Sequence, residues 1–414
     1  MTRLHIRNIG LLGGLNPDGV VQRRGDDMRL LPSVEHVWLQ VEGDHIRQWG
    51  QMEEEPPLTH GVEVWDAEGA WAMPAFVDPH THLVHSGTRE QEWIARSKGA
   101  TYQEIAASGG GIMHSVRMLR AADYGALLDE SRGRLETIRA MGVGSVEIKS
   151  GYGLDFAAEG KIMRVIRALA AEYPEMNLFS TCLALHAVAP EFEGNASAYV
   201  ERVTGDWIPR WAGEGLIDFV DIFCEQGYFG LRDLDSLMTC AQKLGLKVRA
   251  HVNQFSVMGA VGRAVDGGAL TVDHLEELAE EDLAALQSGA TYPVLLPGCS
   301  FFLGIPYAPA RRLIEAGLPV VVGSDYNPGS SPGLNPFFTL CLACQKLGMS
   351  PTEALNAMTL NAAASLEISD RAGCIEPGKE ASLLFIYGIN DWATLPYHFG
   401  QIPPLRVMLK GRFV

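Results

Sequence analysis

The chain has 414 residues, of which 47% are hydrophobic and 20% are charged, a balance typical of a globular protein with a large core. Its formal net charge of −17 opposes binding to nucleic acid or to an anionic membrane, because both partners require clustered Lys and Arg. No apolar run approaches the roughly 20 residues that span a bilayer, and the first residues lack the apolar core of a signal peptide. We therefore expect a cytoplasmic protein with no membrane segment.

Short strands are predicted at both ends of the chain. An alternating segment at 37–41 is followed by a Gly43-Asp44 turn, and short strands return near the C-terminus, as at 405–409. We predict that the two ends pair into one small β-sandwich domain. The predicted boundaries of its two parts are 1–70 and 371–414.

The middle of the chain, residues 71–370, alternates between short apolar runs and longer segments with helical signals. Within one such segment, Ile162, Val165, Ile166 and Leu169 recur at the spacing of one helix face. Near-continuous apolar strands suit a parallel sheet that helices cover. A doubly wound sheet alternates in the same way, but eight units favour an α/β fold of the (β/α)8 TIM-barrel type. The eight runs are 76–82, 145–150, 179–186, 219–225, 246–252, 270–275, 291–296 and 319–325.

Two histidines, His80 and His82, end the first of these runs. Side chains alternate along a strand, so both imidazoles lie on one face, at the carboxyl end of the strands where barrel active sites form. His251 closes the fifth run and Asp325 closes the eighth. Three imidazoles and one carboxylate suit one Zn²⁺ or Fe²⁺/Fe³⁺ per subunit. We assign these four residues as the metal ligands.

Other polar residues also end predicted strands: His186 the third, Glu225 the fourth and His274 the sixth. A single buried His is more often a hydrogen-bonded core residue, but several at strand ends beside a His-x-His pair indicate a catalytic site. The ion would lower the pKa of a bound water toward about 7. Asp325 is then placed to take the water's proton. His274 would polarise a carbonyl or pass a proton to a leaving nitrogen.

The motifs carry a resemblance to known proteins. Residues 75–82 resemble the first barrel strand of the amidohydrolase superfamily. The segments Lys-Ser-Gly-Tyr-Gly at 149–153 and Asp-x-Asn-Pro-Gly-Ser at 325–330 are specific to its imidazolonepropionase family. The resemblance implies hydrolysis of the cyclic amide of 4-imidazolone-5-propanoate to N-formimino-L-glutamate in histidine degradation, and a homodimer. Further resembling segments are 99–102, 108–112 and 295–298.

The resemblance also implies how the substrate is bound. Arg89 would bind the propionate carboxylate, a role that suits its bidentate guanidinium, whereas its position alone favours an ion pair with Glu90 or Glu92. The three glycines at 109–111 fit a mobile lid or a close backbone approach to substrate. The remaining implied substrate contacts are Tyr152, His186, Asn327, Gly329 and Ser330.

One position departs from the family pattern. Many members carry Glu where this chain has Gln254. An amide cannot carry a proton, although it can hydrogen-bond the amide or amidine edge of the ring. Gln254 is therefore counted among both the substrate-binding and the catalytic residues, and the proton transfers fall to His274 and Asp325.

Two other functions remain open from the sequence. A related deaminase or deiminase, acting on formiminoglutamate or a purine-like ring, would use similar ligands and release ammonia. A non-catalytic scaffold descended from a hydrolase would typically lack metal ligands, and this chain has all four.

Overall fold

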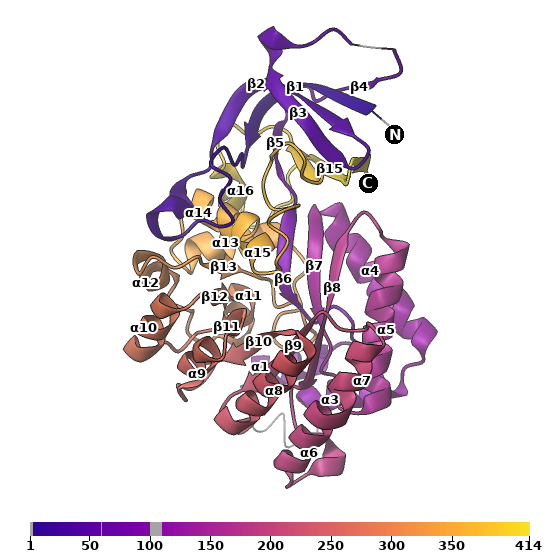
Figure 1. Ribbon diagram of the computed structural model, residues 1–414, viewed down its shortest axis with the longest axis vertical. Helices are drawn as coiled ribbons and strands as arrows, with labels where there is room; N and C mark the ends of the chain where they lie inside the picture. The colour runs from indigo at the N-terminus through magenta and orange to yellow at the C-terminus, as the bar shows by residue number, and fades with distance from the viewer. Residues whose placement is uncertain (1–2, 59, 100–109) are drawn as a thin grey trace.

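The computed structural model describes residues 3–58, 60–99 and 110–414. Two eight-stranded sheets organise the chain, a parallel sheet in the centre and a mixed sheet beside it (Figure 1). Both termini lie in the mixed sheet. Among the described helices, none is both long and apolar enough for a bilayer crossing.

Each of the eight predicted apolar runs overlaps one strand of the parallel sheet, and neighbours in the sheet are neighbours in sequence. The first and last strands meet where the Asp325 amide donates to the His80 carbonyl at 3.0 Å and the His82 amide donates to the Tyr326 carbonyl at 2.7 Å. These bonds close the sheet into the predicted barrel. The strands are β6 (Phe76–Thr81), β7 (Val143–Lys149), β8 (Asn177–Leu185), β9 (Phe219–Cys224), β10 (Lys247–Val252), β11 (Thr271–His274), β12 (Tyr292–Leu295) and β13 (Val321–Val322).

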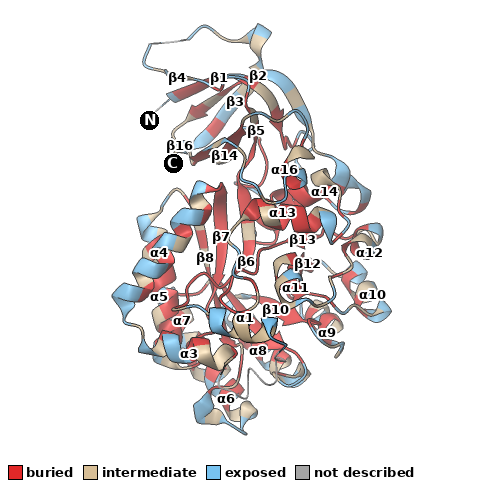
Figure 2. Cartoon of the chain, turned by 180° about the vertical axis from the view of Figure 1, so that it is seen from behind, coloured by how far each residue is buried: buried red, intermediate tan, exposed pale blue. Residues whose placement is uncertain are grey.

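Helices surround the barrel with their apolar faces inward (Figure 2). The predicted stripe of Ile162, Val165, Ile166 and Leu169 is fully buried in its helix, and Asp155 caps that helix through the Ala158 amide. The long helices are α3 (Ile112–Ala121), α4 (Tyr124–Ala140), α5 (Phe156–Glu172), α8 (Leu231–Leu244) and α13 (Pro336–Gln345). The shorter ones are α1 (Glu90–Ser97), α6 (Ala196–Arg202), α7 (Ile208–Gly213), α9 (Ala260–Asp266), α10 (Glu280–Ser288), α11 (Pro297–Leu303), α12 (Ala310–Glu315), α14 (Pro351–Ala357), α15 (Leu360–Ala364) and α16 (Thr394–Tyr397).

The second sheet is built from both ends of the chain, as predicted, and forms one continuous mixed sheet with its own apolar core. Its central strand β5 pairs with a strand from the N-terminal part on one side and with one from the C-terminal part on the other. Trp71–Pro74 thus belongs to this sheet. The strands are β1 (Arg3–Gly13), β2 (Ser33–Glu42), β3 (His45–Gln51), β4 (Glu63–Asp66), β5 (Trp71–Pro74), β14 (Leu383–Ile386), β15 (Leu405–Leu409) and β16 (Arg412–Phe413).

Gly142 marks a close contact between the barrel and the terminal sheet. It has a positive φ of 92° just before β7, and an added Cβ would lie 2.1 Å from a methyl carbon of Leu384 in β14. We expect Gly142→Ala to lower the free energy of unfolding by roughly 1–3 kcal/mol, because both the backbone and the packing oppose a side chain. Equilibrium urea unfolding measures this effect.

Gly133 provides the matched control. It lies in α4, and an added Cβ there would meet nothing within 4 Å. Gly133→Ala should raise the free energy of unfolding by up to about 1 kcal/mol, the difference in helix propensity. Equal stability of the two variants would contradict our account of this contact.

Candidate active site

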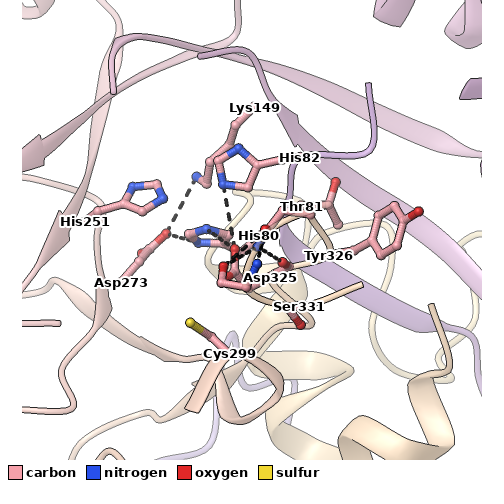
Figure 3. A network of polar contacts seen from close by, with 12 residues as sticks. His80, Thr81, His82, Lys149, His251, Asp273, Cys299, Asp325, Tyr326 and Ser331 are labelled. Carbon is pink, nitrogen blue, oxygen red and sulfur yellow. Dashed lines mark hydrogen bonds and ion pairs between the residues drawn. The ribbon is translucent and has the colours of Figure 1, made fainter. Parts of the chain in front are cut away.

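Three buried imidazoles meet at the carboxyl end of the barrel strands. His80 lies in β6, His82 follows that strand, and His251 lies in β10; one ligand atom from each lies within 4.8 Å of the others. The Asp325 carboxylate joins them, with its Oδ1 at 3.5 Å from His80 Nε2 and 3.7 Å from His82 Nε2 (Figure 3). The structure therefore brings the four predicted ligands together.

The chemistry of these imidazoles fits a metal ion. Within the described chain, the buried Nε2 atoms of His80 and His251 have no hydrogen-bond partner, which is costly unless a ligand is bound. The Nδ1 of His80 is 2.6 Å from Asp273, and the Nδ1 of His251 is 3.1 Å from Asp221. Carboxylates at Nδ1 select the tautomer whose Nε2 lone pair is available to a cation.

Burial supports the same protonation state. It lowers the pKa of His80, His82 and His251, which keeps the three rings neutral near pH 7. Burial also raises the pKa of Asp325 to about 7. A divalent cation would oppose that last shift, because it favours the carboxylate. Together these groups form a buried histidine triad typical of the metal site of amidohydrolases.

A buried ion cluster lies beneath the triad. The Lys149 ammonium is 2.8 Å from Asp221, 3.6 Å from Asp273 and 2.9 Å from Glu147. Burial opposes the charge on this lysine, but the carboxylates of Asp221 and Glu147 outweigh burial and raise its pKa. Sequence analysis gave Lys149 only as the first residue of the family-like segment 149–153 and missed both supporting aspartates. The signal for Asp221 was a lone carboxylate inside an otherwise apolar strand, and that for Asp273 was a carboxylate directly before the strand-end His274.

An open cleft of about 680 Å³, a volume that includes the solvent space at its mouth, lies over the imidazole triad and Asp325. Its walls include every residue predicted to bind substrate and His274, the predicted proton carrier. Sequence analysis missed several of the wall residues, which are mainly aromatic or apolar: Arg96, Ile112, Phe223, Tyr228, Phe255 and Leu303. The predicted residues on the walls are Arg89, Tyr152, His186, Gln254, His274, Asn327, Gly329 and Ser330.

Arg89 both lines the cleft and forms an ion pair. Its Nη2 is 2.6 Å from the Glu92 carboxylate, whose other oxygen accepts from the Gly111 amide at 3.0 Å. A Cβ at Gly329 would lie 1.9 Å from Arg89 Nη1. A side chain at Gly329 would therefore displace the guanidinium from its present position.

Asn327 shapes the loop that follows the last barrel strand. Its Oδ1 accepts from the amides of Gly329 and Ser330 at 2.8 and 2.7 Å, and its Nδ2 donates to the Asp325 carbonyl at 2.7 Å. Asp325 itself has a positive φ of 53°, a conformation that non-glycine residues adopt rarely and that is common at functional sites. The loop thus holds Asp325 and Ser330 on one side of the cleft.

His186 and Tyr152 also line the cleft. The His186 ring stacks on His82 with centroids 5.3 Å apart and lies 5.5 Å from the Tyr152 ring. Its Nδ1 is 3.2 Å from the Gly151 carbonyl, and burial lowers its pKa to about 3. His186 therefore presents a neutral imidazole beside the metal cluster.

Glu225, another predicted strand-end residue, is absent from the described lining of the cleft. Its carboxylate accepts hydrogen bonds from the Phe255 amide at 3.0 Å and from the Ser256 hydroxyl. It therefore fixes the loop that carries Gln254, whose Nε2 donates to Cys299 Sγ at 3.3 Å. The expectation that Glu225 belongs to the reactive site is wrong, because its side chain turns toward this loop.

Part of the glycine-rich segment lies outside the described residues. Residues 100–109 cover most of the family-like segments 99–102 and 108–112, including the first of the three glycines. Gly111 is described; it has a φ of 71° and precedes α3. The predicted lid therefore stays a prediction.

Comparison with known proteins agrees with this geometry. The model of the amidohydrolase family matches residues 229–414. Imidazolonepropionase from Christiangramia forsetii is 40% identical over 411 residues, covering 99% of this chain and 100% of the relative, and that from Pseudomonas fluorescens is 41% identical, covering 91% and 94%. The crystal structure of 5-methylcytosine deaminase from Klebsiella pneumoniae liganded with phosphonocytosine is similar in fold, with a TM-score of 0.76, 17% identity and coverage of 99% and 97%.

The carboxylates behind the imidazoles lead to a test of metal binding. We expect Asp273→Asn to weaken metal affinity by about 10- to 100-fold, because the His80 ring loses the acceptor that fixes its tautomer. Metal content after dialysis against a graded chelator, measured by atomic emission, checks this. Asp235→Asn removes a partly exposed carboxylate on α8 and should retain full metal content. Equal retention by both variants would contradict the supporting role of Asp273.

Proposed function

Because the chain belongs to the imidazolonepropionase family of amidohydrolases, we propose that it opens the ring of 4-imidazolone-5-propanoate with water. The observation that carries the proposal is Arg89 on the wall of a cleft whose floor is a buried metal-ligand cluster. A guanidinium recognises a carboxylate in bidentate fashion. The substrate's propionate would lie against Arg89, with its ring over the imidazoles.

The proposed metal ligands are His80, His82, His251 and Asp325. Three imidazoles with one carboxylate favour one Zn²⁺ or Fe²⁺/Fe³⁺ per subunit. When bound, such an ion lowers the pKa of a water molecule toward neutrality and polarises a carbonyl oxygen. The family relationship also supports the homodimer and the cytoplasmic location that we expected. The barrel expected at 71–370 would begin after Pro74, because Trp71–Pro74 belongs to the sheet formed by the flanking parts at 1–70 and 371–414.

The chain's own residues would move the protons. The water oxygen bonds to the ring carbonyl carbon, the carbon–nitrogen bond breaks, and the departing nitrogen takes a proton. We assign Asp325 to accept the proton that water loses and His274 to bind the carbonyl or to protonate the nitrogen. Gln254, as an amide, would hydrogen-bond the amidine edge of the ring.

The other contacts would orient the ring. Tyr152 and His186 line the cleft, and so does the Asn327 loop with Gly329 and Ser330. A neutral His186 can donate or accept a hydrogen bond without adding charge beside the cation. Holding the ring against these side chains brings its carbonyl to the cluster and reduces the entropy lost on reaction.

An assay of the metal-loaded protein tests this function. With Zn²⁺ or Fe²⁺ bound, we expect the protein to consume 4-imidazolone-5-propanoate, seen as loss of the ring's ultraviolet absorbance, without release of ammonia. No turnover at full metal occupancy would contradict the proposal. Release of ammonia from formiminoglutamate would instead support a deiminase.

The proposed carboxylate site predicts a change in KM. Arg89→Ala should leave metal content intact and raise KM by about 10- to 100-fold, the loss expected for a charged hydrogen-bonded pair. Gly329→Ala should raise KM in the same direction, because the new Cβ would displace the guanidinium.

Gly333→Ala is the control for this prediction, since an added Cβ there meets nothing within 4 Å. Steady-state kinetics of the three variants give the comparison. An unchanged KM in Arg89→Ala would remove Arg89 from the substrate site.

A further inference from the structure

A second buried cluster adjoins the imidazole triad, and two of its three residues, Glu276 and Cys299, have no assigned role. His274, Glu276 and Cys299 each offer a ligand atom within 4.8 Å of the others, and all three are buried. His274 lines the cleft, whereas Glu276 does not, so the glutamate lies behind the histidine as seen by a substrate. Cys299 belongs to α11 and lies near Asp325 (Figure 3).

The contacts of Glu276 are directed at His274. Its two carboxylate oxygens lie 3.4 and 3.3 Å from His274 Nδ1, and the Ser300 hydroxyl donates to Oε1 at 3.1 Å. The Glu276 side chain is only 1% exposed, so this carboxylate is shielded from bulk water. A buried carboxylate with so few donors interacts strongly with the one imidazole beside it.

The backbone around His274 shows that its orientation is imposed. His274 and Leu275 have positive φ values of 88° and 66°, which cost free energy and persist only where the surroundings hold them. The Glu276 carboxylate two residues on is the group that fixes the ring of His274.

Few carboxylic acids on the walls of the cleft could support proton transfer by His274. Among the wall residues in the described part of the chain, Asp325 is the one carboxylic acid. Gln254 is an amide whose Nε2 donates to Cys299 at 3.3 Å, so it contacts the same cluster without being able to carry a proton. The acid that supports proton transfer by His274 must therefore come from outside the wall.

We propose that Glu276 is the positioning residue for proton transfer by His274: it accepts a hydrogen bond from Nδ1 and so presents Nε2 to the cleft. This inference rests on the proposed hydrolysis. Water supplies a hydroxyl to the carbonyl carbon and a proton to the Asp325 carboxylate. His274, as the imidazolium, gives its Nε2 proton to the departing nitrogen as the carbon–nitrogen bond breaks, and the proton held by Asp325 then replaces the one that His274 gave. The Glu276 carboxylate stabilises the imidazolium before that transfer and keeps the ring in one tautomer.

Glu276→Gln tests the proposal, because it keeps the shape and removes the charge. We expect kcat to fall by about 10²- to 10⁴-fold, the contribution of a positioned acid or base. KM should stay within about threefold and bound metal should be unchanged, since neither the carboxylate site nor the imidazole triad is altered. Glu277→Gln, a change of the exposed neighbour, should behave as the wild type.

Two further variants separate positioning from a merely structural role. Gln254→Glu in the Glu276→Gln background returns a carboxylate to the same cluster, and we expect it to recover part of the lost kcat. Ser300→Ala loosens the Glu276 carboxylate without removing it, and we expect a smaller loss of kcat at unchanged KM. This variant carries the test if Glu276→Gln fails to fold.

Three results would overturn the proposal. The first is a Glu276→Gln variant with the kcat of the wild type, and the second is a Ser300→Ala variant with unchanged kcat when Glu276→Gln is unfolded. The third is a second equivalent of bound Zn²⁺ that Glu276→Gln and Cys299→Ser both lose, because the cluster would then be a cation site. Absence of turnover in the metal-loaded wild type would instead contradict the proposed function itself.

Discussion

The site depends on one buried ammonium, that of Lys149. It neutralises Asp221 and Asp273, and each of these carboxylates fixes the tautomer of one imidazole in the triad. Burial opposes ionisation of Asp221, but His251 and Lys149 hold the pKa of that carboxyl below its ordinary value. Without the ammonium, two buried carboxylates would lie close together and at least one would take up a proton. Burying Lys149, Asp221 and Asp273 costs free energy of desolvation. In exchange, the two carboxylates orient the imidazole ligands.

The contacts that close the barrel also bring the proposed metal ligands together. The first strand carries His80 and is followed at once by His82, and the segment after the last strand carries Asp325. Two backbone hydrogen bonds join these segments, and both involve residues of the cluster or their neighbours. The ligands are therefore placed by the backbone geometry of the closed barrel, and a barrel that failed to close would lose the site.

Much of this arrangement could be predicted from the sequence, because strand ends in a parallel barrel share one edge. That single rule predicts from the sequence alone that His80, His82, His251 and Asp325 lie close together. It was wrong for Glu225, whose side chain turns to the backbone of Phe255 and Ser256. It also missed Asp221 and Asp273, since a carboxylate inside an apolar strand has no local pattern that distinguishes support of a ligand from a core ion pair.

Contacts between residues that are distant in sequence were the other feature that the sequence did not predict. Gly329 resembles a turn glycine in sequence, and only the position of Arg89 explains why a side chain is excluded there. Likewise, the sequence shows that Gln254 cannot carry a proton, but it does not show that the Glu276 carboxylate lies beside His274. Pairs of this kind depend on three-dimensional register, which the hydrophobic pattern does not encode.

The charge near the cleft differs from the charge of the whole chain, which explains how an acidic chain can bind an anion. The net charge of −17 is spread over the whole chain, whereas the described walls of the cleft carry Arg89, which is paired with Glu92, together with Arg96 and the Asp325 carboxylate. A bound dication would add positive charge there, and low-dielectric walls would concentrate its field. A glutamate in place of Gln254 would put negative charge on the wall that faces an anionic substrate. Placing the acid at Glu276, behind the imidazole, keeps a carboxylate beside His274 without adding a negative charge to the described wall of the cleft.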